Sequence, residues 1–498
     1  MIGLLRADAV VVGGGLAGLW AVLHLPADWE VIVVDPGSLG GGSSPWAQGG
    51  MAVAVAPDDS PDLHAQDTIR AGAGLCNTDA LEVLVAEAPR ALDELVEMGV
   101  EFDRTPSGSF DLNREGGQTV ARSVHAADAT GREIMRVVAA RARDRARRFV
   151  GTASRLLVAD GACAGVRVGT THGEVDLTGR AVLLATGGCG ALWPATTNPD
   201  SAVGDAVALA WDAGGDLTDL EFMQFHPTAL AAAGGERRRI LLTEALRGEG
   251  AIVVDGEGKR FLFDMHPDGE LAPRDVVARA IAQRPVAYLD ARPIGAERVR
   301  TRFPNITAAV AEAGFDLAAE PVPIAPAAHY FLGGVATDID GRSSIPSLYA
   351  AGECAATGVH GANRMAGNSL AEAVVFGRRA AMAMAAQAPA RAPDPPDDDG
   401  DASVGVATVD PDAWRGLREA MASGAGLVRS ADELARARAE VDAIASTGSQ
   451  MVRRAAASAS LICRAASERT ESRGVHYRDD HLQRSPEWDG RHLTYRSR

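Results

Sequence analysis

The sequence predicts an α/β fold built around a Rossmann-like nucleotide-binding domain, and three features indicate this fold class. The first is a glycine pattern, Gly13-x-Gly15-x-x-Gly18, between a β-branched run and a helical stretch. The second is a buried apolar run, Ala181–Ala185, that ends close to two glycines. The third is a later run of the same kind, Ser347–Ala351, followed by an alanine-rich stretch. Strands that alternate with helices are typical of a parallel sheet.

The N-terminal residues predict a strand at Ala9–Val12, a helix at Leu16–Leu25 and a second strand at Glu30–Val34. Glycines between a strand and a helix let the backbone approach a pyrophosphate, whose charge the helix N-terminus stabilises. Asp35 follows the second strand, where an acidic residue can accept the ribose hydroxyls of a dinucleotide. We therefore expect a dinucleotide site here rather than a purely structural glycine turn.

Further helices are predicted by apolar residues that recur on one face. This pattern covers Asp79–Val96, the alanine-rich Ser369–Ala386 and the C-terminal region up to about Ser467. Three helix starts have the spacing of a capping box, in which the first side chain and the fourth each accept a backbone N–H: Asp79 with Glu82, Thr130 with Glu133, and Ser430 with Glu433.

These elements divide the chain into parts of different character. The nucleotide-binding domain is expected to be discontinuous, and the region between its halves is rich in polar motifs, which favours an inserted capping domain. A Pro- and Asp-rich stretch then predicts a linker. The expected parts are residues 1–220 and 335–390 for the nucleotide-binding domain, 221–334 for an α+β capping domain, 391–412 for the linker, and 413–498 for a C-terminal helical domain.

Composition and charge exclude several classes of function. The 49 Lys+Arg and 66 Asp+Glu of the 498 residues give a formal charge of −17, which argues against nucleic-acid and anionic-membrane partners. Lys259 is the only lysine and precedes an arginine, so no Walker A loop exists and pyridoxal-phosphate chemistry is disfavoured. The five cysteines lack CxxC spacing, which favours reduced thiols in a cytoplasmic protein and no metal site.

The apolar run Ala9–Leu25 also admits the interpretation of a signal peptide or membrane anchor. Glycines and His24 interrupt it, no basic cluster precedes it, and it is short for a membrane span. We therefore expect no targeting segment.

The nucleotide is expected to be FAD rather than NAD. One glycine fingerprint near residue 1 suits a firmly held FAD, and no second mononucleotide unit for a nicotinamide is visible. Tight turns after apolar strands, at Gly187-Gly188 and at Gly352-Glu353, support the same cofactor. Asn368-Ser369-Leu370 then begins a helix that we expect near the flavin ring.

Nine motifs, spread in order over nearly the whole chain, resemble the flavoproteins of the fumarate reductase/succinate dehydrogenase family. Each motif alone is weak, but their joint occurrence is specific. The motifs are Ala47-Gln48-Gly49-Gly50, Arg114-Glu115-Gly116-Gly117, His125 to Gly131, Gln224-Phe225-His226-Pro227-Thr228, Leu242 to Gly250, Ala272-Pro273-Arg274-Asp275, Ala327-Ala328-His329-Tyr330, His360 to Arg364, and Arg469 to His476.

The resemblance implies a set of cofactor contacts and one difference from part of the family. In the membrane-complex dehydrogenases a histidine ahead of the Ala-Gln-Gly-Gly motif links covalently to FAD, whereas this chain has Ser43 there. We therefore expect non-covalent FAD. The implied contacts are Gly13, Gly14, Gly15, Leu16, Ala17, Gly18, Asp35, Pro36, Ser43, Ser44, Ala47, Gln48, Gly49, Gly50, Asp205, Glu353, Ser369 and Leu370.

The middle region concentrates side chains suited to a dicarboxylate, because Arg, His and Thr donate hydrogen bonds to carboxylates. A structural histidine or surface arginine is the alternative for each one singly. The resemblance implies that His226 and Thr243, with Gln224 and Glu244 nearby, bind one carboxylate, that His329 and Arg364 bind the other, and that Arg274 transfers a proton. A free guanidinium is effectively never deprotonated, so the role of Arg274 rests on the resemblance.

Glu115 favours the members of the family that oxidise L-aspartate, because a substrate ammonium needs a carboxylate partner and succinate has no such group. A loop ion pair with Arg114 is the alternative role. The resemblance then implies hydride loss from the α-carbon to FAD, which gives iminoaspartate, with dioxygen or fumarate as acceptor. This reaction is the first step of de novo NAD (pyridine nucleotide) biosynthesis and supplies quinolinate synthase.

Three other functions are weighed against this one. A soluble fumarate reductase or succinate dehydrogenase flavoprotein is the main alternative, although the chain lacks iron–sulfur and haem ligand spacing. A non-catalytic flavoprotein scaffold is disfavoured by the complete set of polar residues. An FAD-dependent RNA-modifying protein is disfavoured by the acidic charge.

Overall fold

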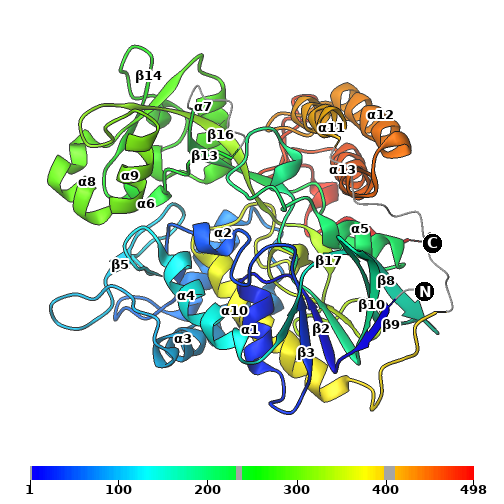
Figure 1. Ribbon diagram of the computed structural model, residues 1–498. Coiled ribbons are helices and arrows are strands. Elements are labelled where there is room, and N and C mark those ends of the chain that lie inside the picture. Colours follow the sequence, from blue (N-terminus) through cyan, green and yellow to red (C-terminus); the bar gives the residue numbers. More distant parts are fainter. Residues whose placement is uncertain (1–2, 232–237, 397–409, 498) are drawn as a thin grey trace.

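A computed structural model describes residues 3–231, 238–396 and 410–497 of the chain (Figure 1). Its centre is a five-stranded parallel sheet. The strand order is β18 (Leu348–Ala350), β11 (Ala181–Leu184), β2 (Ala9–Val12), β3 (Val31–Val34) and β7 (Arg147–Phe149). The strands expected at these places are confirmed, and the glycine loop lies at the carboxyl end of β2.

Both faces of this sheet are covered, because successive side chains of a strand point to opposite faces. In β2, Ala9 and Val11 belong to the core that the sheet forms with one group of helices. These are α1 (Leu16–His24), α3 (Thr78–Met98), α4 (Thr130–Arg143) and α10 (Asn368–Gln387). Val10 and Val12 belong to the core on the other face. The continuous apolar runs in the sequence reflect this two-sided burial.

The other face is covered by a second sheet and, beyond it, by the C-terminal helices. The second sheet has the order β1 (Gly3–Arg6), β10 (Gly173–Thr178), β9 (Ala162–Thr170) and β8 (Thr152–Ala159). The helix α5 (Asp205–Asp212) contacts β8, α13 (Gln450–Glu468) packs on α5, and α11 (Pro411–Gly424) and α12 (Ala431–Thr447) pack with α13. The expected C-terminal helices are confirmed, and they share one apolar core with the sheets.

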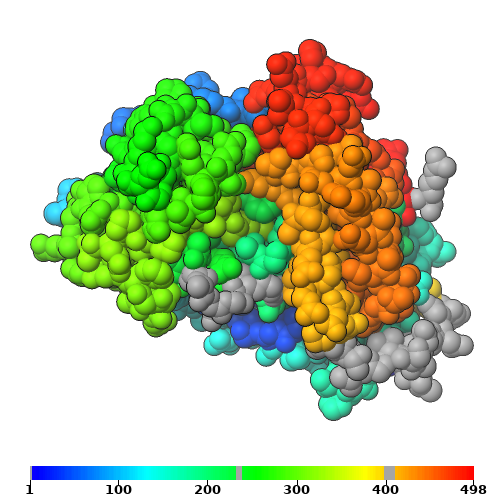
Figure 2. All heavy atoms as spheres, turned by 90° about the horizontal axis from the view of Figure 1, so that it is seen from above, coloured from blue at the N-terminus to red at the C-terminus, as the bar shows by residue number. Residues whose placement is uncertain are grey.

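Residues between β12 and β17 form a cap with its own core. Its antiparallel sheet has the order β13 (Met223–Leu230), β16 (Val322–Phe331), β15 (Ala287–Asp290) and β14 (Ile252–Asp255). Its helices are α6 (Glu244–Gly248), α7 (Arg274–Ala282), α8 (Ala296–Arg302) and α9 (Pro304–Glu312). From above, the cap and the C-terminal helices lie side by side over the nucleotide-binding part (Figure 2).

Two small sheets complete the fold. One has the order β19 (Ala355–Ala356), β17 (Gly334–Ala336), β12 (Leu217–Thr218) and β20 (Thr494–Tyr495), so the end of the chain pairs with the strand that leads into the cap. The other comprises β4 (Met51–Ala52), β6 (Ser123–Val124) and β5 (Leu112–Asn113), and α2 (Pro61–Ala71) lies between β4 and α3 in the chain.

Of the three predicted capping boxes, the structure confirms the N-cap of one. Ser430 caps α12 as expected, because its Oγ accepts a hydrogen bond from the Glu433 N–H. The other two are wrong. Asn77 rather than Asp79 caps α3, and α4 begins without a side-chain cap. Thr130 Oγ instead accepts from the N–H of Ala126, which fixes the turn before the helix.

Most of the expected linker, residues 397–409 within 391–412, lies outside the described residues. In the part of the chain that the structure describes, no helix is both long enough and apolar enough to cross a membrane. The same residues contain no group of three or more His, Cys, Asp or Glu arranged to hold a metal ion.

Candidate active site

A cavity of about 440 Å³ runs from the glycine loop to the cap. Nearly all of the sequence-predicted site residues line it, although they come from distant parts of the chain; Gly18, Gln224 and Glu244 do not. The residues that line it are Gly13, Gly14, Gly15, Leu16, Ala17, Asp35, Pro36, Ser43, Ser44, Ala47, Gln48, Gly49, Gly50, Glu115, Asp205, His226, Thr243, Arg274, His329, Glu353, Arg364, Ser369 and Leu370.

The glycine loop needs its glycines for close approach. Gly13 has φ +117°, and a Cβ there would collide with the Ala185 carbonyl oxygen of the neighbouring strand end. A Cβ at Gly18 would collide with the Gly13 carbonyl oxygen, which explains why this residue packs the helix rather than lining the cavity. A Cβ on Gly15 would meet only Ser44 Oγ, at 3.5 Å, so this glycine leaves room on the cavity side.

Asp35 holds the shape of the loop. Its Oδ2 accepts a hydrogen bond from the N–H of Gly14 at 2.8 Å, and its Oδ1 accepts one from Gly37 at 2.7 Å. The carboxylate also lines the cavity at the end of β3. It therefore lies where a bound nucleotide ribose is expected, with its two oxygens already oriented.

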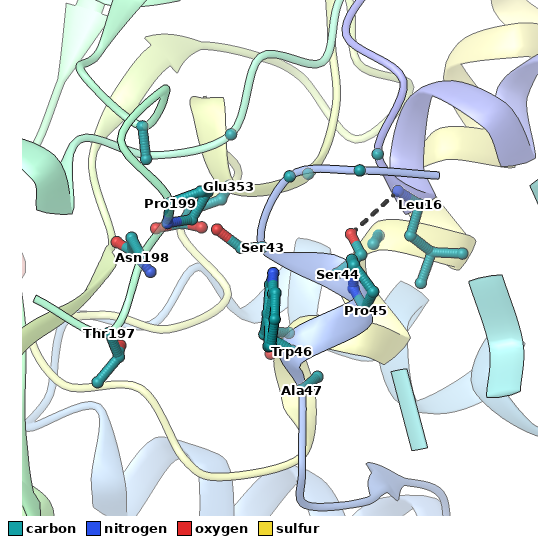
Figure 3. Close-up of a pocket in the computed structure, with 18 of the residues that line it drawn as sticks. Leu16, Ser43, Ser44, Pro45, Trp46, Ala47, Thr197, Asn198, Pro199 and Glu353 are labelled. Carbon is teal, nitrogen blue, oxygen red and sulfur yellow. Dashed lines mark hydrogen bonds between the residues drawn. The ribbon is translucent and has the colours of Figure 1, made fainter. Parts of the chain in front are cut away.

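The segment after β3 bends over the N-terminus of α1 (Figure 3). Ser44 Oγ accepts a hydrogen bond from the Leu16 N–H at 3.1 Å, and this bond joins the segment to the first turn of the helix. Gln48 Oε1 is buried in the cavity wall and has no hydrogen-bond partner among the described residues. FAD carries N–H and O–H donors that can satisfy such an oxygen, so this wall fits the cofactor.

Two mostly buried carboxyl groups also line the cavity. Glu353 Oε1 accepts a hydrogen bond from the N–H of Phe331 at 2.9 Å, and burial raises the pKa of Glu353 to about 7. Burial also raises the pKa of Asp205, although Arg454 of α13 lies 3.3 Å from its Oδ1 and opposes the shift. The C-terminal helices thus contact a residue of the nucleotide end of the cavity.

His226 and His329 face each other at the cap end of the cavity. They lie on the paired strands β13 and β16, and their ring centroids are 5.0 Å apart. The N–H of Thr228 donates to Nδ1 of His226 at 3.3 Å, so the neutral ring carries its proton on Nε2. Burial and then Arg274 lower the pKa of both rings well below the usual value. Both histidines are therefore neutral hydrogen-bond donors at pH 7.

Arg274 and Arg364 share one hydrogen-bond acceptor, which lies outside the cavity lining. Gln224 Oε1 accepts from Arg274 at 3.2 Å and from Arg364 at 3.3 Å. The Gln224 amide donates in turn to Asn363 Oδ1 and to the Arg364 carbonyl oxygen, both at 2.9 Å. Gln224 was expected beside a substrate carboxylate. In the structure it orients the two guanidinium groups from outside the cavity lining.

Glu244 has the same relation to Arg274. Its Oε2 accepts from Arg274 Nε at 2.6 Å, and its Oε1 accepts from Arg247 at 3.0 Å. Burial opposes ionisation of Glu244, but the two arginines outweigh burial and lower its pKa. Glu244 is thus a carboxylate that fixes Arg274, while Thr243, one residue earlier, lines the cavity at the start of α6.

Glu115 is the carboxylate that lines the cavity in this region. Its Oε1 accepts from the N–H of Gly50 at 3.2 Å, which joins the Glu115 loop to the Ala-Gln-Gly-Gly segment. Burial, followed by the charge of Glu244, raises its pKa. A cation bound here would favour the ionised form of Glu115, which burial disfavours.

The sequence did not indicate several residues that support this end. The Arg364 guanidinium lies 4.6 Å from the Tyr330 ring centroid, and Tyr330 OH donates to Glu372 at 2.6 Å. Thr197 Oγ1 lies 2.7 Å from Nδ1 of His329. Tyr330 lies within a motif, but nothing in one sequence shows that it stacks on Arg364. At its cap end the cavity thus brings together Arg274, Arg364, His226, His329 and the Glu115 carboxylate, a set that suits a diacid that also bears an ammonium group.

The sequence matches the FAD binding domain family over residues 8–370, and the fumarate reductase flavoprotein C-terminal family over residues 450–497. It is 47% identical to an L-aspartate oxidase of Synechocystis sp. over 390 residues, which is 75% of this chain and 70% of that protein. It is 43% identical to an L-aspartate oxidase of Streptomyces coelicolor over 99% of this chain and 92% of that protein.

The chain belongs to the L-aspartate oxidase family. Within that family it keeps the fold of the wider group of flavoproteins, because the E. coli quinol fumarate reductase superposes with a TM-score of 0.87 at 29% identity, over 97% of this chain and 93% of that one. Members of the L-aspartate oxidase family are FAD-dependent oxidoreductases, and the cofactor of this chain is FAD. The glycine loop, Asp35 and the segment with Gln48 form the part of the cavity that fits it.

Proposed function

We propose that this chain oxidises L-aspartate to iminoaspartate, with FAD held in the cavity between the glycine loop and the cap. The observation that carries the proposal is the convergence of Glu115 with Arg364, Arg274 and the two histidines on one cavity. A carboxylate among cationic and hydrogen-bond-donating groups complements an amino diacid better than a plain diacid.

The two carboxylates of the substrate are assigned to opposite ends of this cluster. His226 and Thr243 bind one carboxylate, and His329 and Arg364 bind the other. The neutral imidazoles donate hydrogen bonds without adding charge, so the arginines supply the electrostatic attraction. Binding at two points fixes the α-carbon in one orientation and excludes water from it.

Glu115 binds the substrate ammonium in this proposal. When aspartate binds, its ammonium group gives the Glu115 carboxylate a cationic partner, and this favours the ionised form of Glu115. We assign proton transfer to Arg274, on the resemblance. The paired carboxylate of Glu244 keeps Arg274 in place at the cavity.

FAD supplies the redox chemistry, because it accepts the hydride that leaves the α-carbon. The residues that hold it are the glycine loop, Asp35, Ser43, Ser44, Ala47 to Gly50, Asp205, Glu353, Ser369 and Leu370. We propose that FAD is bound without a covalent link, since Ser43 stands where the covalent members of the wider group have a histidine. Acid precipitation tests this, because the flavin colour should stay in the supernatant and not in the pellet.

Dioxygen or fumarate is proposed as the electron acceptor. Iminoaspartate is the expected product and enters de novo NAD biosynthesis, where quinolinate synthase receives it. We also propose a cytoplasmic location, which the free thiol state of all five cysteines supports.

An anaerobic titration of the purified flavoprotein tests the main proposal. L-Aspartate should bleach the flavin absorbance, whereas D-aspartate and succinate should not. Bleaching by succinate and not by L-aspartate would instead assign the chain to the succinate dehydrogenase reaction. Two solved quinol fumarate reductase structures favour that second function only through the shared fold, since they are 29% and 28% identical to this chain.

A further inference from the structure

Gln118 is a buried side chain whose amide connects two loops of the cavity. It is 3% exposed and lies three residues after Glu115. Its Oε1 accepts a hydrogen bond from the Glu115 N–H at 2.9 Å. Its Nε2 donates to Ser123 Oγ at 3.0 Å and to the carbonyl oxygen of Ala366 at 3.3 Å. Both polar atoms of the amide are therefore engaged.

The two connected loops carry groups of opposite charge. Glu115 lies on the first loop, and Arg364 lies two residues before Ala366 on the second. Gln118 and Ala366 are 248 residues apart in the chain, so this bond joins segments that local structure does not hold together. A change at Gln118 would alter the position of Glu115 relative to Arg364.

Glu115 and Arg364 are each held by other neighbours. Glu115 accepts from the Gly50 N–H, while Arg364 donates to Gln224 and Ser369. Each also acts electrostatically on the ionisation of the other. If the two loops could move independently, Coulombic attraction would draw the carboxylate and the guanidinium together and fill the space that a substrate needs.

We propose that Gln118 is a positioning residue that sets the spacing between Glu115 and Arg364 and thereby selects an α-amino diacid over a diacid without the amine. The ammonium and one carboxylate of an α-amino acid share a single carbon, so their binding groups must stand at a fixed separation. A plain diacid uses Arg364 but not Glu115, and it tolerates a change in this separation. The inference rests on the proposed function.

Gln118→Met tests the inference, because methionine keeps the size of the side chain and removes its hydrogen bonds. We expect kcat/KM for L-aspartate to fall about tenfold, which is the effect of losing one or two buried hydrogen bonds. The Kd of succinate, read from the shift of the flavin spectrum, should change by less than about twofold. In a Glu115→Gln background, Gln118→Met should change kcat/KM by less than about twofold, since the two residues act as a unit.

Thr119→Val is the matched control. It removes one hydrogen bond of the same loop, from Thr119 Oγ1 to Asp67, and leaves the bond to Ala366 intact, so both readouts should stay at wild-type values. If Gln118→Met yields no folded flavoprotein, Gln118→Asn keeps the amide with a shorter reach and takes its place.

The possible results distinguish a failure of the inference from a failure of the proposed function. Equal losses of L-aspartate turnover and succinate binding in the Gln118 variant would mean a general structural role and would overturn the inference. Unchanged L-aspartate kinetics in that variant would also overturn it. A wild-type protein whose flavin L-aspartate does not reduce would instead refute the proposed function itself.

Discussion

Burial and neighbouring charges shift the pKa values of individual side chains in this cavity. Burial and the neighbouring Arg274 lower the pKa of Arg364 to about 10, so this guanidinium is still cationic at neutral pH. The Tyr330 ring lies against its plane, and the hydroxyl of Ser369 accepts from it at 2.8 Å. The planar group is thus oriented on one face and at one edge, which leaves donors for a substrate carboxylate.

Replacing Arg364 by lysine keeps the charge and removes the planar, two-pronged donor. We expect Arg364→Lys to lower kcat/KM for L-aspartate by roughly 100-fold, because both binding and orientation of the α-carbon depend on it. Steady-state kinetics with the flavin content measured in parallel give the result. Arg292→Lys, which changes an exposed arginine paired with Asp290 on the cap, should leave the kinetics unchanged. A wild-type kcat/KM in Arg364→Lys would remove this residue from the carboxylate site.

Glu353 predicts a pH-dependent stability. Burial raises its pKa from 4.5 to about 7, so its contribution to stability is complete below the ordinary carboxyl pKa and is lost as pH rises through 7. Glutamine has no such loss. The stability of Glu353→Gln relative to wild type should therefore increase by about 1.4 kcal/mol from pH 6 to pH 8. Urea unfolding of both proteins at the two pH values measures this difference, and a difference that does not change with pH would contradict it.

At the scale of helices and strands, the sequence predicts the elements better than their first residues. The apolar runs of β2, β3 and β11 could be recognised because both faces of the parallel sheet are buried. The start of α3 could not be recognised from the sequence, because it depends on a contact with a residue far away in the chain. The N–H of Asn77 donates to the Gly358 carbonyl oxygen, which holds Asn77 extended and makes it the cap.

For the site too, some residues could be predicted from the sequence and others could not. Residues within glycine-rich and charged motifs could be predicted and line the cavity, because those motifs mark loops that surround it. The supporting residues could not. Gln118 acts on a carbonyl 248 residues away, and Tyr330 acts through Glu372. Such contacts arise from packing between segments, and one sequence carries no signal of them.

The helix start of α3 can be tested directly. Asn77 Oδ1 accepts from the N–H of Ala80 at 3.2 Å, so Asn77→Ala should lower the free energy of unfolding by about 1 kcal/mol. Asp79→Ala removes only a favourable charge in the first turn and should cost about 0.3–1 kcal/mol. Urea unfolding compares the two variants. A larger loss in Asp79→Ala than in Asn77→Ala would restore the capping box that the spacing alone predicts.

At the scale of the whole molecule, the C-terminal segment binds the connection between the nucleotide-binding part and the cap. The N–H of Asp219 donates to the Leu493 carbonyl oxygen at 3.0 Å. Glu221, two residues later, pairs with Arg469 at 2.5 Å, and its carbonyl oxygen accepts from Arg429 at 2.6 Å. The return connection runs alongside, because the N–H of Leu332 donates to the Phe222 carbonyl oxygen. The C-terminal segment therefore contacts the connection that leads into the cap, beside the connection that returns from it.

The Glu221–Arg469 pair is fully buried, and Arg469 also pairs with Glu471. Glu471 has Arg473 as a second partner, so removing Arg469 leaves the Glu221 carboxylate without its ion-pair partner. We expect Arg469→Met to destabilise the protein by about 3–5 kcal/mol, while its apolar side chain keeps the packing against Phe222 and Trp488. Adding Glu221→Gln should recover a large part of the loss, since the charge that needs a partner is then gone. Thermal and urea unfolding measure both variants.

The control for this cycle is an ion pair on the protein surface. Arg438 lies 3.8 Å from Asp442 on α12, and both side chains are about half exposed, so Arg438→Met should change stability by less than about 1 kcal/mol. If the double variant is as unstable as Arg469→Met alone, the loss comes from packing rather than from the unpaired carboxylate. The C-terminal segment would then hold the cap connection by its shape, and the buried charges of Glu221 and Arg469 would have no specific part in it.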